Sequence, residues 1–374
     1  MRPVIRKIDL PKGRRILAVS DIHGHRNHLK NLLEKVGFTN EDILFIVGDI
    51  IEKGPESLET LRYVRALCRQ YDSVYPLMGN VDAWRILMLD AQDPASDEQM
   101  LDYLRSMKRF YGGCFFAELC AEAGLPAETP EQIRIAKARI PGIFRTEIDF
   151  LRNLPTIIDT QNYLFVHAGL PAADLSRLET YDAFEFLKRD AFLEQGLSFD
   201  KYVIVGHWPV MLYGKAYPQA DPIIDRQRKI ISIDGGCGIK EDGQLNMLIL
   251  PAEGTGEITY ESYDDLPQGI AVTAQQEAPA TVFIKWTDCA VEVLEEKLQF
   301  SRVRHITSGK IFAIPNDYLL KYEGKTLCGD YTDYKIEVNP GDRLSVVREN
   351  PQGYFVKKNG RSGWYSGDII PISP

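Results

Sequence analysis

Up to about residue 255, short apolar runs alternate with longer stretches in which apolar residues recur at helical spacing. The apolar runs predict strands at Ile16–Ser20, Ile43–Gly48, Val74–Met78, Tyr163–Val166, Tyr202–Val205, Lys229–Ile233 and Leu245–Leu250. The stretches between them predict helices at His25–Val36 and Glu56–Tyr71 and within Pro130–Asn153. Strands that alternate with helices indicate an α/β (α+β) architecture.

The pattern changes in the last third of the chain. The stretch Asp264–Ala280 is rich in Pro, Gln, Ala and acidic residues, which is typical of a connection. Ile311–Ile370 has short apolar runs separated by turn signals such as Asn339-Pro340-Gly341-Asp342, which is typical of a small β domain. We therefore expect a first domain, a connection or extension, and a small β domain over residues 1–262, 263–308 and 309–374.

Composition narrows the protein class. The chain has 374 residues, about enough for two domains, and its net charge of −9 argues against broad binding of nucleic acid or anionic membranes. The first fifteen residues lack the apolar core of a signal peptide, and no later segment is long enough to span a bilayer. The six cysteines are scattered without a CxxC pair, which is typical of free thiols. These features predict a cytoplasmic protein.

Side chains suited to metal binding follow five of the predicted strands directly: Asp21, His23, Asp49, Asn80, His167 and His207. The carboxyl ends of strands in an open α/β sheet are where sites form, because loops can diverge there. Two carboxylates, three imidazoles and one amide oxygen suit a pair of divalent first-row ions, which a carboxylate can bridge at about 3.5–4 Å. One such match is more often a turn or a surface histidine, but five in succession favour a site.

A family resemblance rests on these residues. The ordered motifs of the phosphoprotein phosphatases, within the calcineurin-like superfamily, are similar to Asp21-Ile22-His23-Gly24, Gly48-Asp49-Ile50-Ile51-Glu52-Lys53-Gly54, Gly79-Asn80-Val81-Asp82, His167-Ala168-Gly169 and Gly206-His207. The resemblance covers about residues 15–250 and implies a β-sandwich flanked by helices, with a dinuclear metal centre at its edge. It implies a first metal on Asp21, His23 and Asp49, and a second metal on Asp49, Asn80, His167 and His207. It favours manganese, with iron, zinc or nickel as alternatives.

The chain departs from the family at two positions that bear on catalysis. The family usually has Asp-Arg-Gly where this chain has Glu52-Lys53-Gly54, so Lys53 keeps the charge for a phosphate oxygen but lacks the bidentate fork of Arg. The family usually has a His, its leaving-group acid, where this chain has Val81. The acidic residue that follows is retained as Asp82.

Two further residues are candidates for catalysis. Arg189 resembles the phosphate-binding Arg that bacterial and phage members place shortly before the Gly-His motif, although a solvated helix charge is the alternative. His25 lies two residues beyond His23, and its imidazole is suited to supply the proton that Val81 cannot. Its alternative role is to begin the following helix. The segment Asp234-Gly235-Gly236 is expected to be a structural turn.

The C-terminal segment resembles an SH3-type barrel. The resemblance rests on Val338–Val347 with its Gly-Asp turn, on the tight hairpin at Asn359-Gly360, and on the Gly-aromatic pair before Tyr365. Such a domain could bind a peptide or an intramolecular ligand, or it could simply dock on the catalytic domain.

Three functions remain open. The first is a phosphomonoesterase, by resemblance a phosphoprotein Ser/Thr or Tyr phosphatase, in which a metal-bridging hydroxide attacks phosphorus directly. The second is a nucleotide phosphoesterase acting on a dinucleoside polyphosphate or a cyclic phosphodiester. The third, which the missing His at Val81 favours, is a metal-binding pseudophosphatase scaffold that acts through the SH3-like domain. The segment from Ala83 to Arg152, with Phe110, Tyr111, Phe115 and Phe116, is the expected place of substrate selection.

Overall fold

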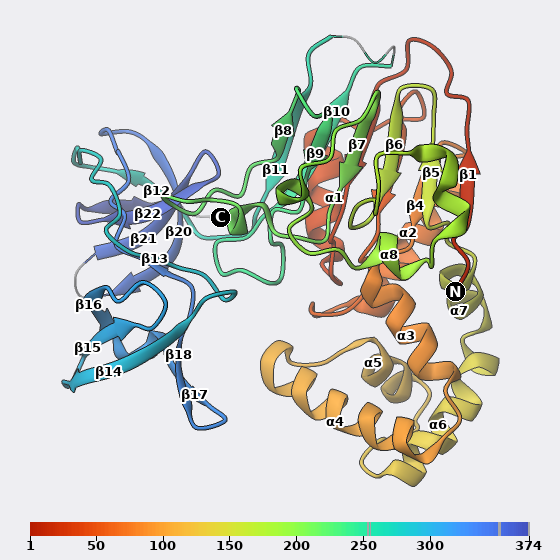
Figure 1. Cartoon of the computed structure of the whole chain (residues 1–374), viewed down its shortest axis with the longest axis horizontal. Coiled ribbons are helices and arrows are strands. Elements are labelled where there is room, and N and C mark those ends of the chain that lie inside the picture. The colour runs from red at the N-terminus through yellow and green to blue at the C-terminus, as the bar shows by residue number, and fades with distance from the viewer. Residues whose placement is uncertain (253, 255, 351–352, 373–374) are drawn as a thin grey trace. The chain divides into compact units, whose positions relative to one another are not determined.

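The computed structural model describes residues 1–252, 254, 256–350 and 353–372. The chain divides into two compact units (Figure 1). The first comprises Met1–Val210 and Asp221–Asp265, and the second comprises Met211–Ala220 and Leu266–Pro374. Each unit is described by itself.

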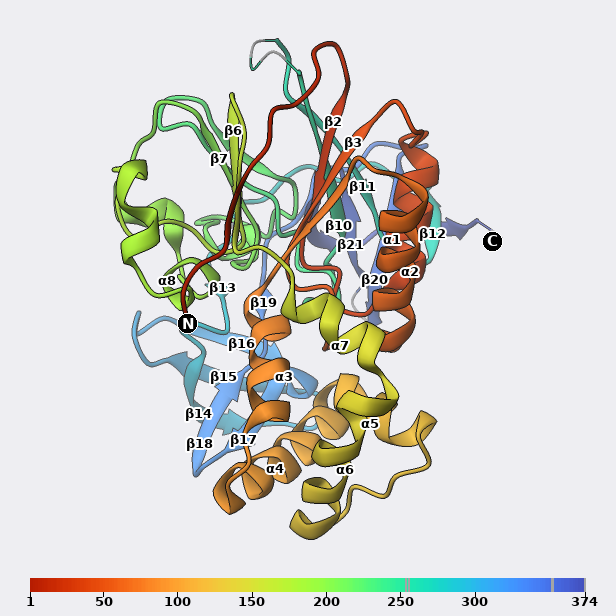
Figure 2. The same cartoon turned by 90° about the vertical axis from the view of Figure 1, so that its right-hand side faces the viewer.

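The first unit contains two sheets (Figure 2). One has the order β1-β5-β6-β7-β9-β8, formed by Ile5–Lys7, Ile157–Asp159, Tyr163–Val166, Tyr202–Val205, Ile230–Ser232 and Ile223–Asp225. The other has the order β11-β10-β2-β3-β4, formed by Thr259–Tyr263, Leu245–Leu250, Ile16–Val19, Ile43–Val47 and Val74–Leu77. All seven strands that the apolar runs predict are present.

The two sheets pack face to face, and strand alternation decides which side chains lie between them. On β2, Ile16 and Ala18 belong to the core cluster that also holds residues of β6, β7 and β9, whereas Leu17 and Val19 belong to the cluster that holds the helices. This is the period of two that a strand imposes on its side chains. Between the sheets, the rings of Phe45 and Phe165 stack with their centroids 3.8 Å apart.

Helices cover the outer face of the β2-containing sheet and one end of the unit. Helices α1 (Arg26–Lys35) and α2 (Ser57–Gln70) pack on the sheet. The helices between β4 and β5, called the insertion here, gather toward the lower end of the unit in Figure 1. They are α3 (Asn80–Asp90), α4 (Pro94–Tyr111), α5 (Phe115–Glu122), α6 (Pro130–Ile143) and α7 (Arg145–Arg152). A short helix, α8 (Phe184–Leu187), and 3₁₀ turns at Leu175–Thr180 and Phe192–Gln195 follow β6. The α/β fold predicted from the sequence is confirmed.

The insertion shares one hydrophobic core with α1, α2 and the β2-containing sheet, and this core includes part of the aromatic set expected to select a substrate. Phe115 and Phe116 are buried, at 2% and 3% exposure, while Phe110 is exposed. Lys137 is also buried, and its ammonium donates to Ser96 Oγ at 2.8 Å and Asp97 Oδ1 at 2.9 Å. Since Phe115 and Phe116 are packed inside, they are not available to contact a substrate.

The second unit holds two five-stranded sheets with separate cores. One has the order β22-β21-β20-β12-β23, formed by Arg361–Tyr365, Gly353–Lys358, Arg343–Asn350, Gln268–Ala271 and Ile369–Pro371. The other has the order β16-β15-β14-β18-β17, formed by Ile311–Pro315, Phe300–His305, Ala290–Glu296, Lys325–Cys328 and Leu319–Tyr322. A short pair, β13 (Phe283–Ile284) with β19 (Tyr331–Thr332), completes the unit.

The segment 263–308, expected to be a connection or extension, carries strands β12 to β15. The sequence does not reveal β12 because its partners β20 and β23 lie far along the chain, so its pairing is non-local. The SH3-like character of the second unit stays a prediction.

Candidate active site

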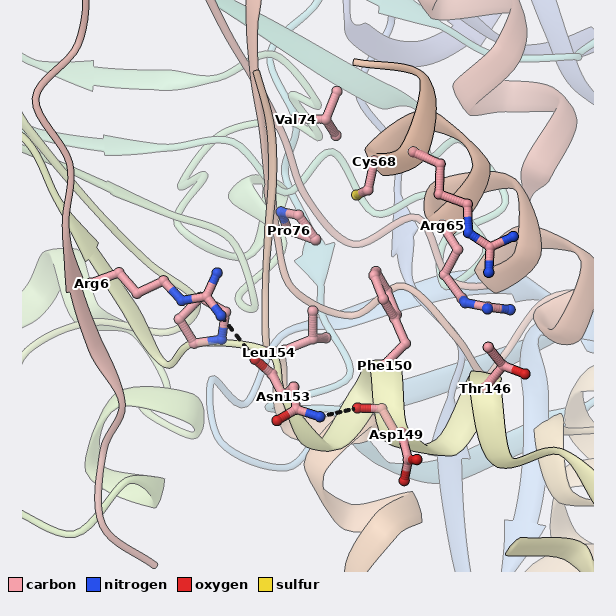
Figure 3. A pocket seen from close by; sticks show the side chains of 12 residues that line it. Arg6, Arg65, Cys68, Val74, Pro76, Thr146, Asp149, Phe150, Asn153 and Leu154 are labelled. Carbon is pink, nitrogen blue, oxygen red and sulfur yellow. Dashed lines mark hydrogen bonds between the residues drawn. The ribbon is translucent and has the colours of Figure 1, made fainter. Parts of the chain in front are cut away.

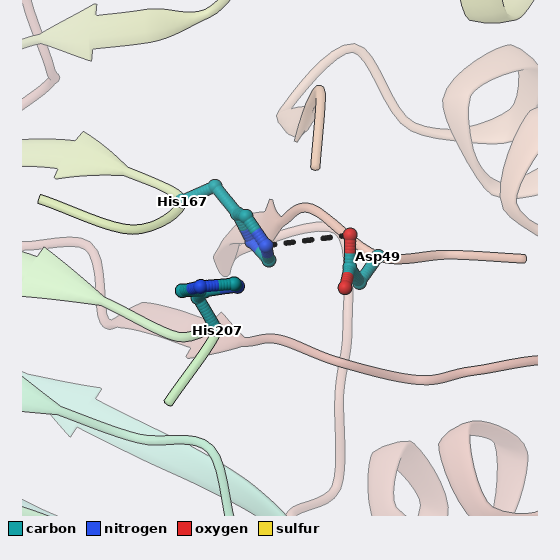
Figure 4. Close-up of side chains that lie close together, drawn as sticks. All are labelled: Asp49, His167 and His207. Atoms are coloured by element: carbon teal, nitrogen blue, oxygen red, sulfur yellow. Dashed lines mark ion pairs between the residues drawn. The ribbon is translucent and has the colours of Figure 1, made fainter. Parts of the chain in front are cut away.

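The six residues expected to bind metals come together at the ends of their strands. One group consists of Asp21, His23 and Asp49, and the other of Asp49, His167 and His207, with the ligand atoms of each group within 4.8 Å of one another. Figure 4 shows the second group. Asn80 joins the second group, because its Oδ1 lies 2.9 Å from His167 Nε2 and 2.9 Å from His207 Nδ1.

Asp49 belongs to both groups and presents a different oxygen to each. Its Oδ2 lies 3.8 Å from His23 Nε2, and its Oδ1 lies 3.3 Å from His167 Nε2. A carboxylate between two ligand sets in this way has the geometry of a bridging ligand.

The first group fits a divalent cation because two of its buried polar atoms lack a hydrogen-bond partner in the described part of the chain. Asp21 Oδ1 and His23 Nε2 are buried and have no hydrogen-bond partner among the described residues. Burial raises the pKa of Asp21 to about 6 and lowers the pKa of His23. A buried polar atom without a partner costs about 1–3 kcal/mol, and a cation held between carboxylate and imidazole removes that cost.

Four candidate ligands have a positive φ, which only a few other non-glycine residues among those described have. Asp21, His23, Asp49 and His207 have φ values of 53°, 48°, 51° and 67°. Non-glycine residues rarely adopt this left-handed region, which costs about 1–3 kcal/mol each, and such residues cluster at functional sites. Four of the six candidate ligands therefore carry strain that the surrounding structure must offset.

Three glycines let the ligands interlock. A Cβ on Gly48 would lie 2.6 Å from His167 Nδ1, one on Gly79 would lie 2.1 Å from Asp49 Oδ1, and one on Gly206 would lie 2.2 Å from Asp21 Oδ2. Each glycine directly precedes one ligand and makes room for another. The close approach that these glycines allow is therefore between candidate ligands.

Backbone and carboxylate partners orient two of the histidines. His167 Nδ1 lies 2.8 Å from the carbonyl of Val47, so its Nε2 faces Asp49 and Asn80. His207 Nε2 lies 3.0 Å from Asp190 Oδ1, which leaves Nδ1 toward Asn80. A carboxylate behind a metal-binding imidazole fixes the ring and raises its basicity. The sequence analysis did not single out Asp190.

Arg189 has local contacts instead. Its guanidinium contacts Glu185 and donates to Gln195 Oε1 at 3.2 Å, and none of its described contacts is with a metal-ligand candidate. The physical reason is the extended backbone that follows α8, where Lys188 has φ −138° and ψ 94°. In an extended segment neighbouring side chains point to opposite sides.

Lys53 and His25 lie in the loops around the first group. The pKa of His23 is lowered mainly by burial and next by the positive charge of Lys53. Lys53 therefore lies within electrostatic range of the centre. His25 Nδ1 lies 2.7 Å from the carbonyl of His23, and its ring fits against Gly54 and Gly238, where an added Cβ would clash. This anchoring leaves Nε2 as the nitrogen that could serve a substrate.

Asp82 is fully buried and serves the loops. Its carboxylate accepts backbone N–H groups from Gly79 at 2.9 Å, Ile50 at 3.1 Å and Ile51 at 3.3 Å. Burial, with the charge of Asp49, raises its pKa to about 7. These contacts tie the loop after β3 to the start of α3.

A separate pocket of about 460 Å³ lies between α2, α7 and strand β4 (Figure 3). It is lined in part by Arg6, Arg65, Arg69, Phe150 and Asn153. None of its lining residues is a predicted site residue, so this pocket is distinct from the ligand cluster.

Comparison with known proteins identifies the family. The model of the calcineurin-like phosphoesterases matches residues 14–234, which is more than half of the chain and includes the whole ligand cluster. The chain belongs to this family. Calcineurin-like phosphoesterases use a dinuclear divalent metal centre, and the two ligand groups that share Asp49 are the candidates for it here. No helix among the described residues is both long and apolar enough to cross a membrane.

The curated relatives include several proteins named bis(5'-nucleosyl)-tetraphosphatase, symmetrical. The one from Aromatoleum aromaticum (strain DSM 19018 / LMG 30748 / EbN1) is 30% identical over 156 residues, 41% of this chain and 44% of the relative. The one from Buchnera aphidicola subsp. Baizongia pistaciae (strain Bp) is 49% identical over 65 residues, 17% of this chain and 22% of the relative. The matched parts thus span less than half the length of these two relatives.

The similar solved structures differ in their descriptions. A candidate diadenosine tetraphosphatase is 21% identical with a TM-score of 0.43, and the match covers 70% of this chain and 99% of that one. A protein serine/threonine phosphatase from Saccharomyces cerevisiae is 15% identical with a TM-score of 0.43, covering 71% and 85%.

Proposed function

We propose that this chain hydrolyses a phosphoanhydride bond of a dinucleoside polyphosphate at a dinuclear divalent metal centre held by Asp21, His23, Asp49, Asn80, His167 and His207. The observation that carries the proposal is the side chain at Val81, where the family's motif has its proton donor. The names of the curated relatives support the same substrate class.

The argument from Val81 concerns the leaving group. An alkoxide, such as the one released from phosphoserine, must be protonated as it departs, and general-acid help is typically worth about 10²–10⁴-fold. A phosphate released from an anhydride has a second pKa of about 6 and departs without that help. A site without an acid at this position therefore suits an anhydride better than an alkyl ester.

The helical face that carries Val81 offers no substitute acid. Val81 donates its backbone N–H to Asp49 Oδ1 at 3.1 Å, and its side chain has no proton to give. One turn further along α3 lies Arg85, whose Nε lies 3.3 Å from Glu52 Oε1. A guanidinium stays protonated in proteins, so it can stabilise charge but cannot act as the acid. His25 stays the predicted donor for substrates that need one.

The remaining roles follow from the geometry. Bound at this centre, two divalent ions would supply Lewis acidity and lower the pKa of a water to a range where it is a nucleophile at neutral pH. Lys53 would offset charge on the equatorial oxygens of the attacked phosphate. Asp49 would belong to both ligand groups and so fix their positions relative to each other.

The deciding experiment compares substrates on one metal-loaded preparation. With manganese added, we expect P1,P4-di(adenosine-5') tetraphosphate to be hydrolysed with a kcat/KM at least ~10²-fold above that for a phosphoserine peptide. Chromatography of the products then tells symmetrical cleavage, which releases ADP alone, from asymmetrical cleavage, which releases AMP and ATP. Asp49→Asn is the matched inactive control.

Two outcomes would contradict the proposal. A higher kcat/KM for the phosphopeptide would favour the phosphoprotein phosphatase that the motifs alone suggest. Full metal content without hydrolysis of either substrate, or of a cyclic phosphodiester, would favour the pseudophosphatase scaffold.

A further inference from the structure

The loop between β3 and α2 carries Lys53, and this loop is strained where Lys53 lies. Glu52 and Lys53 have φ values of 74° and 62°, in the left-handed region that non-glycine residues avoid. A strained loop keeps such a conformation only when its surroundings hold it there. Groups on both sides of Lys53 hold this loop.

On the side before Lys53, the loop is held through the Glu52 carboxylate. This side chain is fully buried, and its Oε2 accepts a hydrogen bond from Tyr103 Oη on α4 at 2.8 Å. Its Oε1 lies 3.3 Å from Arg85 Nε on α3, and the Arg85 guanidinium stacks 3.8 Å over the Tyr103 ring. Three groups from three segments thus form one buried network.

On the side after Lys53, the loop is held by α5. Glu118 accepts the backbone N–H of Ser57 at 2.9 Å and that of Leu58 at 2.8 Å, which are the first two residues of α2. A carboxylate at this position satisfies N–H groups that have no partner within the helix. Ser57 Oγ in turn accepts the N–H of Glu52 at 3.0 Å, which joins the two anchors.

We infer that the helical insertion positions Lys53, with Tyr103 and Glu118 as positioning residues that act through the Glu52 and Ser57 anchors of the loop. Helices α3, α4 and α5 all contribute contacts to the loop or its anchors, through Arg85, Tyr103 and Glu118 respectively. The insertion is therefore part of the phosphate-binding apparatus and not only a cover beside it. The inference rests on the proposed role of Lys53 at the substrate phosphate.

The test uses Tyr103→Phe, which removes one hydroxyl and keeps the ring under Arg85. In the metal-loaded full-length protein we expect inorganic phosphate, measured by calorimetry, to bind about tenfold more weakly. Tyr63→Phe is the matched control, since Tyr63 is also a partly buried helical tyrosine and no hydrogen bond of its hydroxyl is among the described contacts. The control is expected to leave phosphate binding and the melting temperature unchanged.

A double-mutant cycle separates positioning from general destabilisation. If Tyr103 acts through Lys53, Tyr103→Phe should weaken phosphate binding in the wild-type background and have little further effect in the Lys53→Ala background. Glu118→Gln should show the same dependence and should also speed hydrogen exchange at the amides of Ser57 and Leu58.

Equal losses in both backgrounds, or no loss in either, would overturn the inference. The probe is inorganic phosphate, so failure of the dinucleotide as substrate leaves this test intact. If Lys53→Ala alone leaves phosphate binding unchanged, then the role of Lys53 is wrong, and the inference falls with it.

Discussion

Gly79 offers a test of the centre with a single added methyl group. It precedes Asn80 and packs against Asp49, so an added Cβ would lie 2.1 Å from both Asp49 Oδ1 and Asp49 N. Its backbone has φ −99° and ψ 174°, which alanine adopts without strain. The effect of Gly79→Ala is therefore steric and falls on the residue shared by both ligand groups.

The size of the effect follows from that contact. Side-chain carbons do not approach other heavy atoms closer than 3.0 Å, so Asp49 and the loop at Gly79 must separate by about 1 Å. A displacement of about 1 Å at a reacting centre costs on the order of 10²-fold in rate. Since Asp49 faces both ligand groups, we expect kcat/KM to fall about 10²-fold and the metal content to fall below two ions per chain.

The assay is metal content by mass spectrometry after gel filtration, together with kcat/KM at fixed manganese. Gly113→Ala is the matched control, because a Cβ there meets nothing within 4 Å and the residue is outside the left-handed region. A Gly79→Ala variant with full metal content and the wild-type kcat/KM would show that the metals do not bind at Asp49.

Further predictions concern metals, substrate and stability. Asp49→Asn should reduce occupancy of both metal sites, and Asp21→Asn that of one; equal single-site losses would remove Asp49 from the bridging role. Lys53→Ala should raise KM or lower kcat/KM at nearly constant melting temperature, and unfolding with unchanged kinetics would refute its role. Lys137→Met leaves the buried Asp97 carboxylate without its ammonium, so it should lower the free energy of unfolding by about 3–5 kcal/mol, measured in urea. A loss below about 1 kcal/mol would contradict the expected cost of leaving a buried charge without its partner.

The sequence predicts the ligand cluster well because each candidate ligand is encoded locally. An apolar run of four to six residues defines the strand, and the first polar residues after it lie at the sheet edge. The positive φ of Asp21 or Asp49 is not readable in the same way, because neither residue type requires it. The loops that carry these residues are held by long-range hydrogen bonds, such as the one from the His207 N–H to Asp21 Oδ2 at 2.9 Å.

What the sequence missed depends on contacts that no local pattern records. Glu52 lies inside a matched motif, but its partners Arg85 and Tyr103 lie on helices whose spacing to the loop is set by tertiary packing. In the sequence Asp190 is an ordinary charged residue, because its contact with His207 depends on the tertiary position of the loop after β7. Arg189 is a candidate by resemblance, its guanidinium contacts Glu185 and Gln195, and its catalytic role stays a prediction.

The division of the chain limits how the second unit can be removed or transferred. The backbone passes between the units three times, after Val210, Ala220 and Asp265, because Met211–Ala220 belongs to the second unit. Within that unit, the Ala220 N–H donates to the Gly360 carbonyl at 2.7 Å, and the Tyr217 ring stacks on Tyr334 at 4.9 Å. Truncation after Asp265 would therefore leave a decapeptide, four residues beyond His207, without the strands that order it. Transfer of the second unit to another phosphoesterase would require both of its segments, Met211–Ala220 and Leu266–Pro374.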